Sequence, residues 1–98
     1  MTVSTHVLDA DSGEPARGIP VTLTDADGAS IASATTDGDG RAQLAAGALP
    51  AGTYRLRFDV ATPFYPEITI AFRIAEPAAK HHVPLLLSRY SYTTYRGS

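Results

Sequence analysis

Two stretches of strict two-residue alternation restrict the fold of this chain more than any other feature. In the first, Tyr54, Leu56 and Phe58 alternate with charged residues, and in the second every other residue from Ile68 to Ile74 is large and apolar. Successive side chains of a β-strand point to opposite faces, so this period is typical of strands with one buried face. No useful length of the chain follows the roughly 3.6-residue period of a helix. The sequence therefore predicts an all-β protein.

Shorter runs between turn-forming residues predict the other strands. Clusters of Asp and Gly, such as Asp25–Gly28 and Asp37–Gly40, are typical of turns. The predicted strands cover residues 3–9, 19–24, 30–36, 41–44 (a brief edge strand), 54–59, 68–74, 82–88 and 90–95. Seven or eight short strands with regular turn signals indicate a two-sheet antiparallel β-sandwich, in a single domain over residues 1–98.

The connection from Val60 to Pro66 is predicted to contain no helix. It is short and holds two prolines, Pro63 and Pro66. Proline interrupts the hydrogen bonds of a helix, and a helix of so few residues is unstable without other support.

The composition argues against several classes of function. A monomer of 98 residues buries only about 60–70% of its unfolded surface, so association with further copies is a ready way to bury more. The net charge of -2, without a basic block, argues against nucleic-acid binding. The chain has no cysteine, no apolar run near the ~20 residues that span a membrane, and no signal-peptide pattern at Met1–His6. We therefore expect a cytoplasmic protein without nucleic-acid or membrane partners.

His6 and His82 are the candidate proton carriers of the chain at neutral pH. Alternation along residues 82–88 directs Val83, Leu85 and Leu87 inward, and His82, Pro84 and Leu86 outward. His6 shares the outward face of its strand with Leu8, while His81 points toward the core with Val83. Outward leucines beside the two histidines indicate an interface or a pocket wall. Two ordinary surface histidines remain the alternative interpretation.

Arg41 follows the glycine-rich turn Asp37–Gly40, which lets its guanidinium approach an anionic or carbonyl-rich ligand. An ordinary surface arginine fits the same pattern. The turn lacks the further ligands of a calcium loop, and no His-x-His or His-Glu-x-x-His spacing occurs, so we expect no metal. No Gly-x-Ser-x-Gly motif supports a serine nucleophile.

Five segments together resemble a known family. They are Ser4–Asp9, Thr36–Arg41, Phe64–Ile68, His82–Ser88 and the closing Tyr95–Ser98. The family is the transthyretin-related proteins, the 5-hydroxyisourate hydrolases of urate breakdown, and the resemblance covers nearly the whole chain.

The resemblance implies a transthyretin-like sandwich that assembles as a homotetramer, a dimer of dimers with active sites at the mouths of a central channel. The implied reaction is hydrolysis of 5-hydroxyisourate to 2-oxo-4-hydroxy-4-carboxy-5-ureidoimidazoline without a cofactor. By motif, the implied catalytic residues are His6, Arg41, His82 and Ser98. The implied substrate-binding residues are these four with Tyr95, Arg96 and Gly97. The alternative is a non-catalytic carrier that binds an aromatic small molecule in the channel.

The sequence departs from the family pattern at three places. Arg89 stands where the family usually has proline, Lys80–His81 replaces the usual His-Tyr, and the stretch Asp59–Phe64 is much shorter than usual. The first two bear on the rim of the channel. The third removes a short helix but none of the motif residues.

Overall fold

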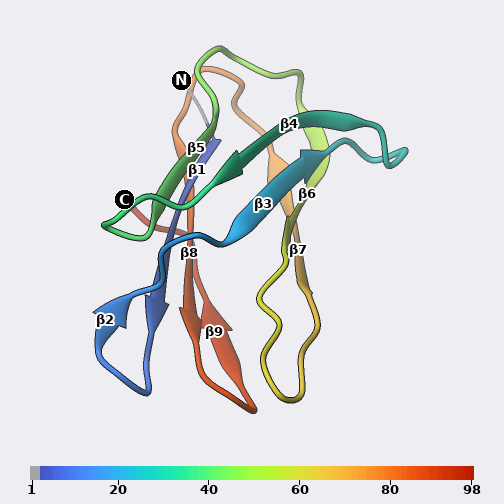
Figure 1. The fold of residues 1–98 in the computed structure, drawn as a ribbon. Helices are drawn as coiled ribbons and strands as arrows, with labels where there is room; N and C mark the ends of the chain where they lie inside the picture. The colour runs from blue at the N-terminus through green and yellow to red at the C-terminus, as the bar shows by residue number, and fades with distance from the viewer. Residues whose placement is uncertain (1–2) are drawn as a thin grey trace.

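The computed structural model describes residues 3–98 and arranges them as two β-sheets packed face to face (Figure 1). Its strands are β1 (Val3–Asp9), β2 (Glu14–Pro15), β3 (Pro20–Thr24), β4 (Ser30–Thr35), β5 (Arg41–Ala45), β6 (Gly52–Phe58), β7 (Ile68–Ile74), β8 (His81–Leu87) and β9 (Tyr92–Thr94). The predicted two-sheet all-β architecture is confirmed. One domain over residues 1–98 stays a prediction, and residues 1–2 lie outside the described range.

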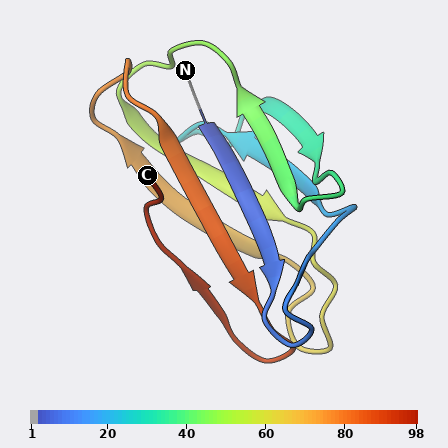
Figure 2. The ribbon, with the colours of Figure 1, turned by 90° about the vertical axis from the view of Figure 1, so that its left-hand side faces the viewer.

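The order of the strands brings the two ends of the chain together. One sheet has the order β2-β1-β8-β9, with β5 also paired to β1, and the other has the order β4-β3-β6-β7. All pairs are antiparallel, as predicted, except β1 with β8, which run parallel (Figure 2). Tight turns impose antiparallel pairing, but β1 and β8 are joined by most of the chain, so no turn fixes their relative direction.

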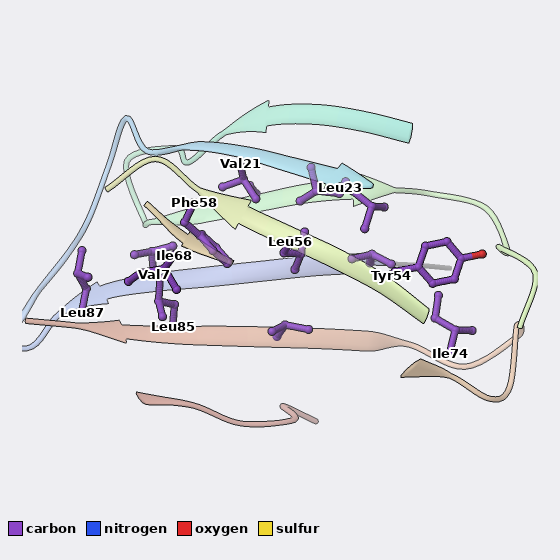
Figure 3. Close-up of a cluster of buried hydrophobic side chains, with 14 residues drawn as sticks. Val7, Val21, Leu23, Tyr54, Leu56, Phe58, Ile68, Ile74, Leu85 and Leu87 are labelled. Atoms are coloured by element: carbon purple, nitrogen blue, oxygen red, sulfur yellow. The ribbon is translucent and has the colours of Figure 1, made fainter. Parts of the chain in front are cut away.

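The core lies between the sheets and is formed mainly by the apolar faces that alternation predicted (Figure 3). Ile70 and Phe72 of the predicted face of β7 are only partly buried. Leu56, Phe58 and Leu85 are fully buried. Burial of one such side chain stabilises the fold by about 1.5–3 kcal/mol. The whole set of buried apolar residues is Val3, Val7, Val21, Leu23, Ala42, Leu44, Tyr54, Leu56, Phe58, Ile68, Ile74, Val83, Leu85 and Leu87. The outer faces of β1 and β8 are not part of this core, so their side chains are available to contact a ligand or another chain.

Two details differ from the prediction. The strand β2 was not predicted. It has only two residues and pairs with β1, and it brings the number of strands within residues 3–98 to nine. Pro84 shares the predicted outward face with His82, but it is buried, which was not predicted. The chain after β8 folds back over it, because Oγ1 of Thr94 donates to the Pro84 carbonyl over 2.8 Å and Gly97 packs near its ring. Leu8 and Leu86 are half-buried.

The connection Val60–Pro66 contains no helix, as predicted. Hydrogen bonds between Thr62 and Tyr65 close it as a turn: the Thr62 N–H donates to the Tyr65 carbonyl over 2.8 Å, and the Tyr65 N–H donates to Oγ1 of Thr62 over 2.7 Å. Within residues 3–98 the structure shows no helix that is long and apolar enough to cross a membrane.

The turn Asp37–Gly40 is anchored on β1, and this anchor places the start of β5 beside His6. The Val7 N–H donates to the Gly40 carbonyl over 2.7 Å. Gly40 is buried at φ +77°, and a Cβ at this position would overlap the carbonyl oxygen of Val7. Only glycine combines this left-handed conformation with so close an approach.

We expect Gly40→Ala to lower the free energy of unfolding by about 1–3 kcal/mol, because the new methyl group combines backbone strain with a clash against β1. Gly38→Ala in the same turn is the matched control, since a Cβ there meets open space. Denaturant unfolding of both variants measures the difference. Equal stability of the two variants would show that the anchor does not need glycine.

Candidate active site

The side chain of His82 is held by β1 on one side. His82 pairs with Ser4 across the parallel strands, and Oγ of Ser4 lies 2.9 Å from Nδ1 of the imidazole. Both side chains point outward, away from the core, as alternation along the two strands predicted for His82.

The segment Tyr95–Ser98, here called the tail, holds His82 from the other side. The Gly97 N–H donates to the His82 carbonyl over 2.8 Å and forms an isolated antiparallel bridge. A Cβ on Gly97 would lie 2.5 Å from Cδ2 of His82 and 3.2 Å from Cγ of Pro84. The backbone of Gly97 therefore lies against the His82 ring and leaves no room for a side chain.

Arg41 is the first residue of β5 and pairs with His6 of β1. Oδ1 of Asp37 accepts the N–H groups of Asp39 and Arg41, at 2.9 and 3.0 Å. The hydrogen bond from the Arg41 backbone, then that from Asp39, lowers the pKa of Asp37, and the charges of Arg41 and His6 add to the effect. A carboxylate thus fixes the backbone from which the exposed Arg41 side chain extends.

His6 is turned toward this same turn. Its Nε2 lies 2.9 Å from the carbonyl oxygen of Asp39. A carbonyl only accepts hydrogen bonds, so Nε2 of His6 carries a hydrogen.

A cavity of about 400 Å³ opens beside His82, between β1, β5 and the tail. Its polar lining includes Ser4, Asp37, Arg41, Lys80, His82 and Ser98. Two positively charged side chains (Arg41 and Lys80), the carboxylate of Asp37 and the imidazole of His82 thus surround a space large enough for a small heterocycle. His6 does not line this cavity; it lies behind it, at the turn.

The electrostatics of this cavity favour the neutral form of His82. Partial burial lowers the pKa of its imidazole, and the nearby charges of Arg41 and His6 lower it further, while a backbone hydrogen bond with Ser4 opposes them. At neutral pH the ring is therefore mostly uncharged and able to accept a proton.

Tyr95 and Arg96 line a different cavity from Ser98. This second cavity, of about 280 Å³ and mainly apolar, is also lined by Ile70, Phe72, His81 and His82, so His82 borders both cavities. Nη2 of Arg96 also donates to the Lys80 carbonyl over 3.3 Å.

The structure thus divides the residues that the motifs suggested. It brings Arg41, His82 and Ser98 to one cavity, puts Gly97 against His82, and separates His6, Tyr95 and Arg96 from that cavity. Ser4 was not singled out, although it shares the outward face of β1 with His6 at a spacing of two residues. Within residues 3–98, no three His, Asp or Glu side chains are grouped so as to hold a metal ion.

The chain is similar to proteins of known activity over almost its whole length. It is 40% identical to the 5-hydroxyisourate hydrolase of Caulobacter vibrioides, over 98% of this chain and 97% of the relative. The solved 5-hydroxyisourate hydrolase of Klebsiella pneumoniae is 34% identical, with a TM-score of 0.90 and full coverage of both chains. Sea bream transthyretin in complex with thyroxine is 31% identical, with a TM-score of 0.86, over 99% of this chain and 95% of that one.

The family model described as the HIUase/Transthyretin family matches residues 3–97, from the start of β1 into the tail. The match includes Ser4, Arg41, His82 and Gly97. With this match and the relatives above 30% identity, the fold and the sequence agree, and the chain belongs to the HIUase/Transthyretin family.

Proposed function

We propose that this protein hydrolyses 5-hydroxyisourate to 2-oxo-4-hydroxy-4-carboxy-5-ureidoimidazoline. The observation that carries the proposal is that His82 lines the same cavity as Arg41 and Ser98, where partial burial lowers the pKa of its imidazole. The hydrolases named above, which resemble the chain over its full length, support the same reaction.

In this reaction the imidazole of His82 takes a proton from water, and the resulting hydroxide bonds to a carbonyl carbon of the six-membered ring. The acyl C–N bond then breaks, and the departing nitrogen takes up a proton from the imidazolium. Arg41 faces the carbonyl oxygen and steadies the negative charge that develops on it. A positioned acid–base group of this kind contributes roughly 10²–10⁴ in rate.

The remaining motif residues serve binding and assembly in this proposal. Ser98 at the mouth of the cavity offers polar contacts to the urate-like edges of the substrate. His6 supports the turn from which Arg41 extends. We further propose a homotetramer, a dimer of dimers, in which Tyr95 and Arg96 face a neighbouring subunit. The exposed rings of Tyr90, Tyr92 and Tyr95 on so small a domain support association.

A non-catalytic carrier is the second candidate. The likeness to transthyretin in complex with thyroxine favours it, as does the mainly apolar cavity beside Tyr95. Such a carrier does not need a neutral imidazole beside an arginine, so the enzyme is the stronger candidate.

The decisive assay generates 5-hydroxyisourate in place from urate and urate oxidase and follows the loss of its absorbance. The hydrolase should accelerate this loss well above the spontaneous rate, in proportion to the amount of protein added. Decay at the spontaneous rate would reject the enzyme and leave the carrier.

We expect His82→Ala to lower kcat about 10²-fold or more, because it removes the proton acceptor. His6→Ala should give a loss of the same order, through the displaced Arg41 turn. Both side chains point away from the core, so the denaturation midpoints should stay near that of the wild type. Variants that keep wild-type turnover, or that lose it only by unfolding, would contradict these roles.

The pH profile should follow the lowered pKa of His82. Protonation of the imidazole removes the base, so kcat/KM should fall as the pH drops through a pKa below the ordinary histidine value of about 6.5. Folding stability changes in the same direction, since the unfolded chain binds the proton more tightly than the folded protein. An acid limb centred above pH ~6.5 would contradict a neutral, partly buried base.

Gly97→Ala should lower kcat on the order of tenfold to hundredfold, because the new methyl group would displace the His82 ring or the tail. Gly47→Ala is the matched control, since a Cβ at that position meets open space. Hydroxyisourate turnover and the melting temperature are measured for both. If Gly97→Ala turns over substrate as fast as the control, the close packing of tail and ring has no part in catalysis.

A further inference from the structure

The contacts of His82 leave one ring nitrogen for chemistry. Ser4 lies beside Nδ1, and Gly97 lies against Cδ2. These two ring atoms are both bonded to Cγ and form the two flanks of the imidazole. Nε2 therefore lies at the end of the ring that is away from the backbone of His82. No residue in the range 3–98 forms a hydrogen bond with it.

The surroundings of the ring bear on which nitrogen carries the hydrogen of the neutral imidazole. The hydroxyl of Ser4 can donate or accept, so the 2.9 Å contact alone leaves both tautomers open. The cavity favours one of them, because Arg41 lines it together with His82 and a guanidinium donates hydrogen bonds but never accepts them, which favours an unprotonated Nε2. The hydrogen of the neutral ring then lies on Nδ1, where the Ser4 hydroxyl accepts it, and an interaction with the Ser4 backbone that raises the pKa of His82 acts in the same direction.

His6 has the opposite arrangement. The Asp39 carbonyl holds the hydrogen of His6 on Nε2, the atom that His82 leaves unprotonated. Of the two histidines, only His82 lines the cavity with Arg41. The difference between them therefore lies in their hydrogen-bond partners as well as in their positions.

We propose that Ser4 is a positioning residue that accepts the Nδ1 hydrogen of His82 and so keeps Nε2 unprotonated as the proton acceptor of the site. The part of this inference that concerns turnover rests on the proposed hydrolase function. Ser4 acts through the imidazole and does not take part in proton transfer itself.

The test combines nitrogen NMR with kinetics. In full-length protein without ligand, above the pKa of His82, the ring ¹⁵N shifts report which nitrogen is protonated. The wild type should show hydrogen on Nδ1. Ser4→Ala should shift the ring toward hydrogen on Nε2 and lower kcat about threefold to tenfold with little change in KM, which is the effect of one lost hydrogen bond.

Two variants separate positioning from a general effect on the fold. Ser4→Thr keeps the hydroxyl and should restore both the Nδ1–H signal and most of kcat. Ser33→Ala removes an exposed hydroxyl from β4 of the other sheet and should match the wild type in spectrum and rate.

A wild-type ring protonated on Nε2, or a Ser4→Ala variant with wild-type shifts and kcat, would overturn the proposal. The spectra are recorded without substrate, so they decide the tautomer whether or not the protein hydrolyses hydroxyisourate. Failure of Ser4 as a positioning residue is thereby distinguished from failure of the hydrolase function.

Discussion

The parallel pairing of β1 with β8 is the contact on which the rest of the structure depends. It joins the first described strand to a strand near the end of the sequence, and it sets Ser4 opposite His82. The inner faces of both strands fill the centre of the core with Val7 and Leu85. The same register that buries these side chains turns Ser4 and His82 outward together, because faces alternate along each strand. Core packing and site geometry thus share one cause.

The site itself is built from backbone groups as much as from side chains. The Gly97 N–H binds the His82 carbonyl, the Val7 N–H binds the Gly40 carbonyl, and Asp37 binds the Arg41 N–H. These bonds fix the backbone that carries His82 and Arg41 without using a polar atom of either side chain. His82 and Arg41 thus line the same cavity, and no ion pair within residues 3–98 engages either side chain.

Much of the fold follows from local pattern in the sequence. Alternation located the long strands, directed His82 outward and His81 inward, and the two prolines between Val60 and Pro66 indicated a connection without a helix. Alternation says nothing about which strands pair, so the parallel register of β1 and β8 was out of its reach. The burial of Pro84 was missed for the same reason, since it depends on the chain that folds back after β8.

The site was predictable in its parts but not in its grouping. The motifs named Arg41, His82 and Ser98, which meet at one cavity. They also named His6, which pairs with Arg41 but does not line that cavity, and Tyr95 and Arg96, which line a second cavity beside His82. Gly97 was expected among the substrate-binding residues, whereas its backbone lies against the ring of His82. Ser4 opens the first of the family-like segments, but no role was predicted for its side chain. Its importance arises only from the register with β8.

The tail is an ordered part of the site, because the Gly97 N–H holds it on His82. Amide hydrogen exchange at Gly97 in the full-length protein tests this directly, because a hydrogen-bonded amide exchanges only when the structure opens. We expect the Gly97 amide to exchange about tenfold or more slowly than in an unstructured chain, because one backbone hydrogen bond gives protection of this order. Exchange of Gly97 at the rate of an unstructured chain would show that the tail is not held on His82. The imidazole would then be held only from the side of β1.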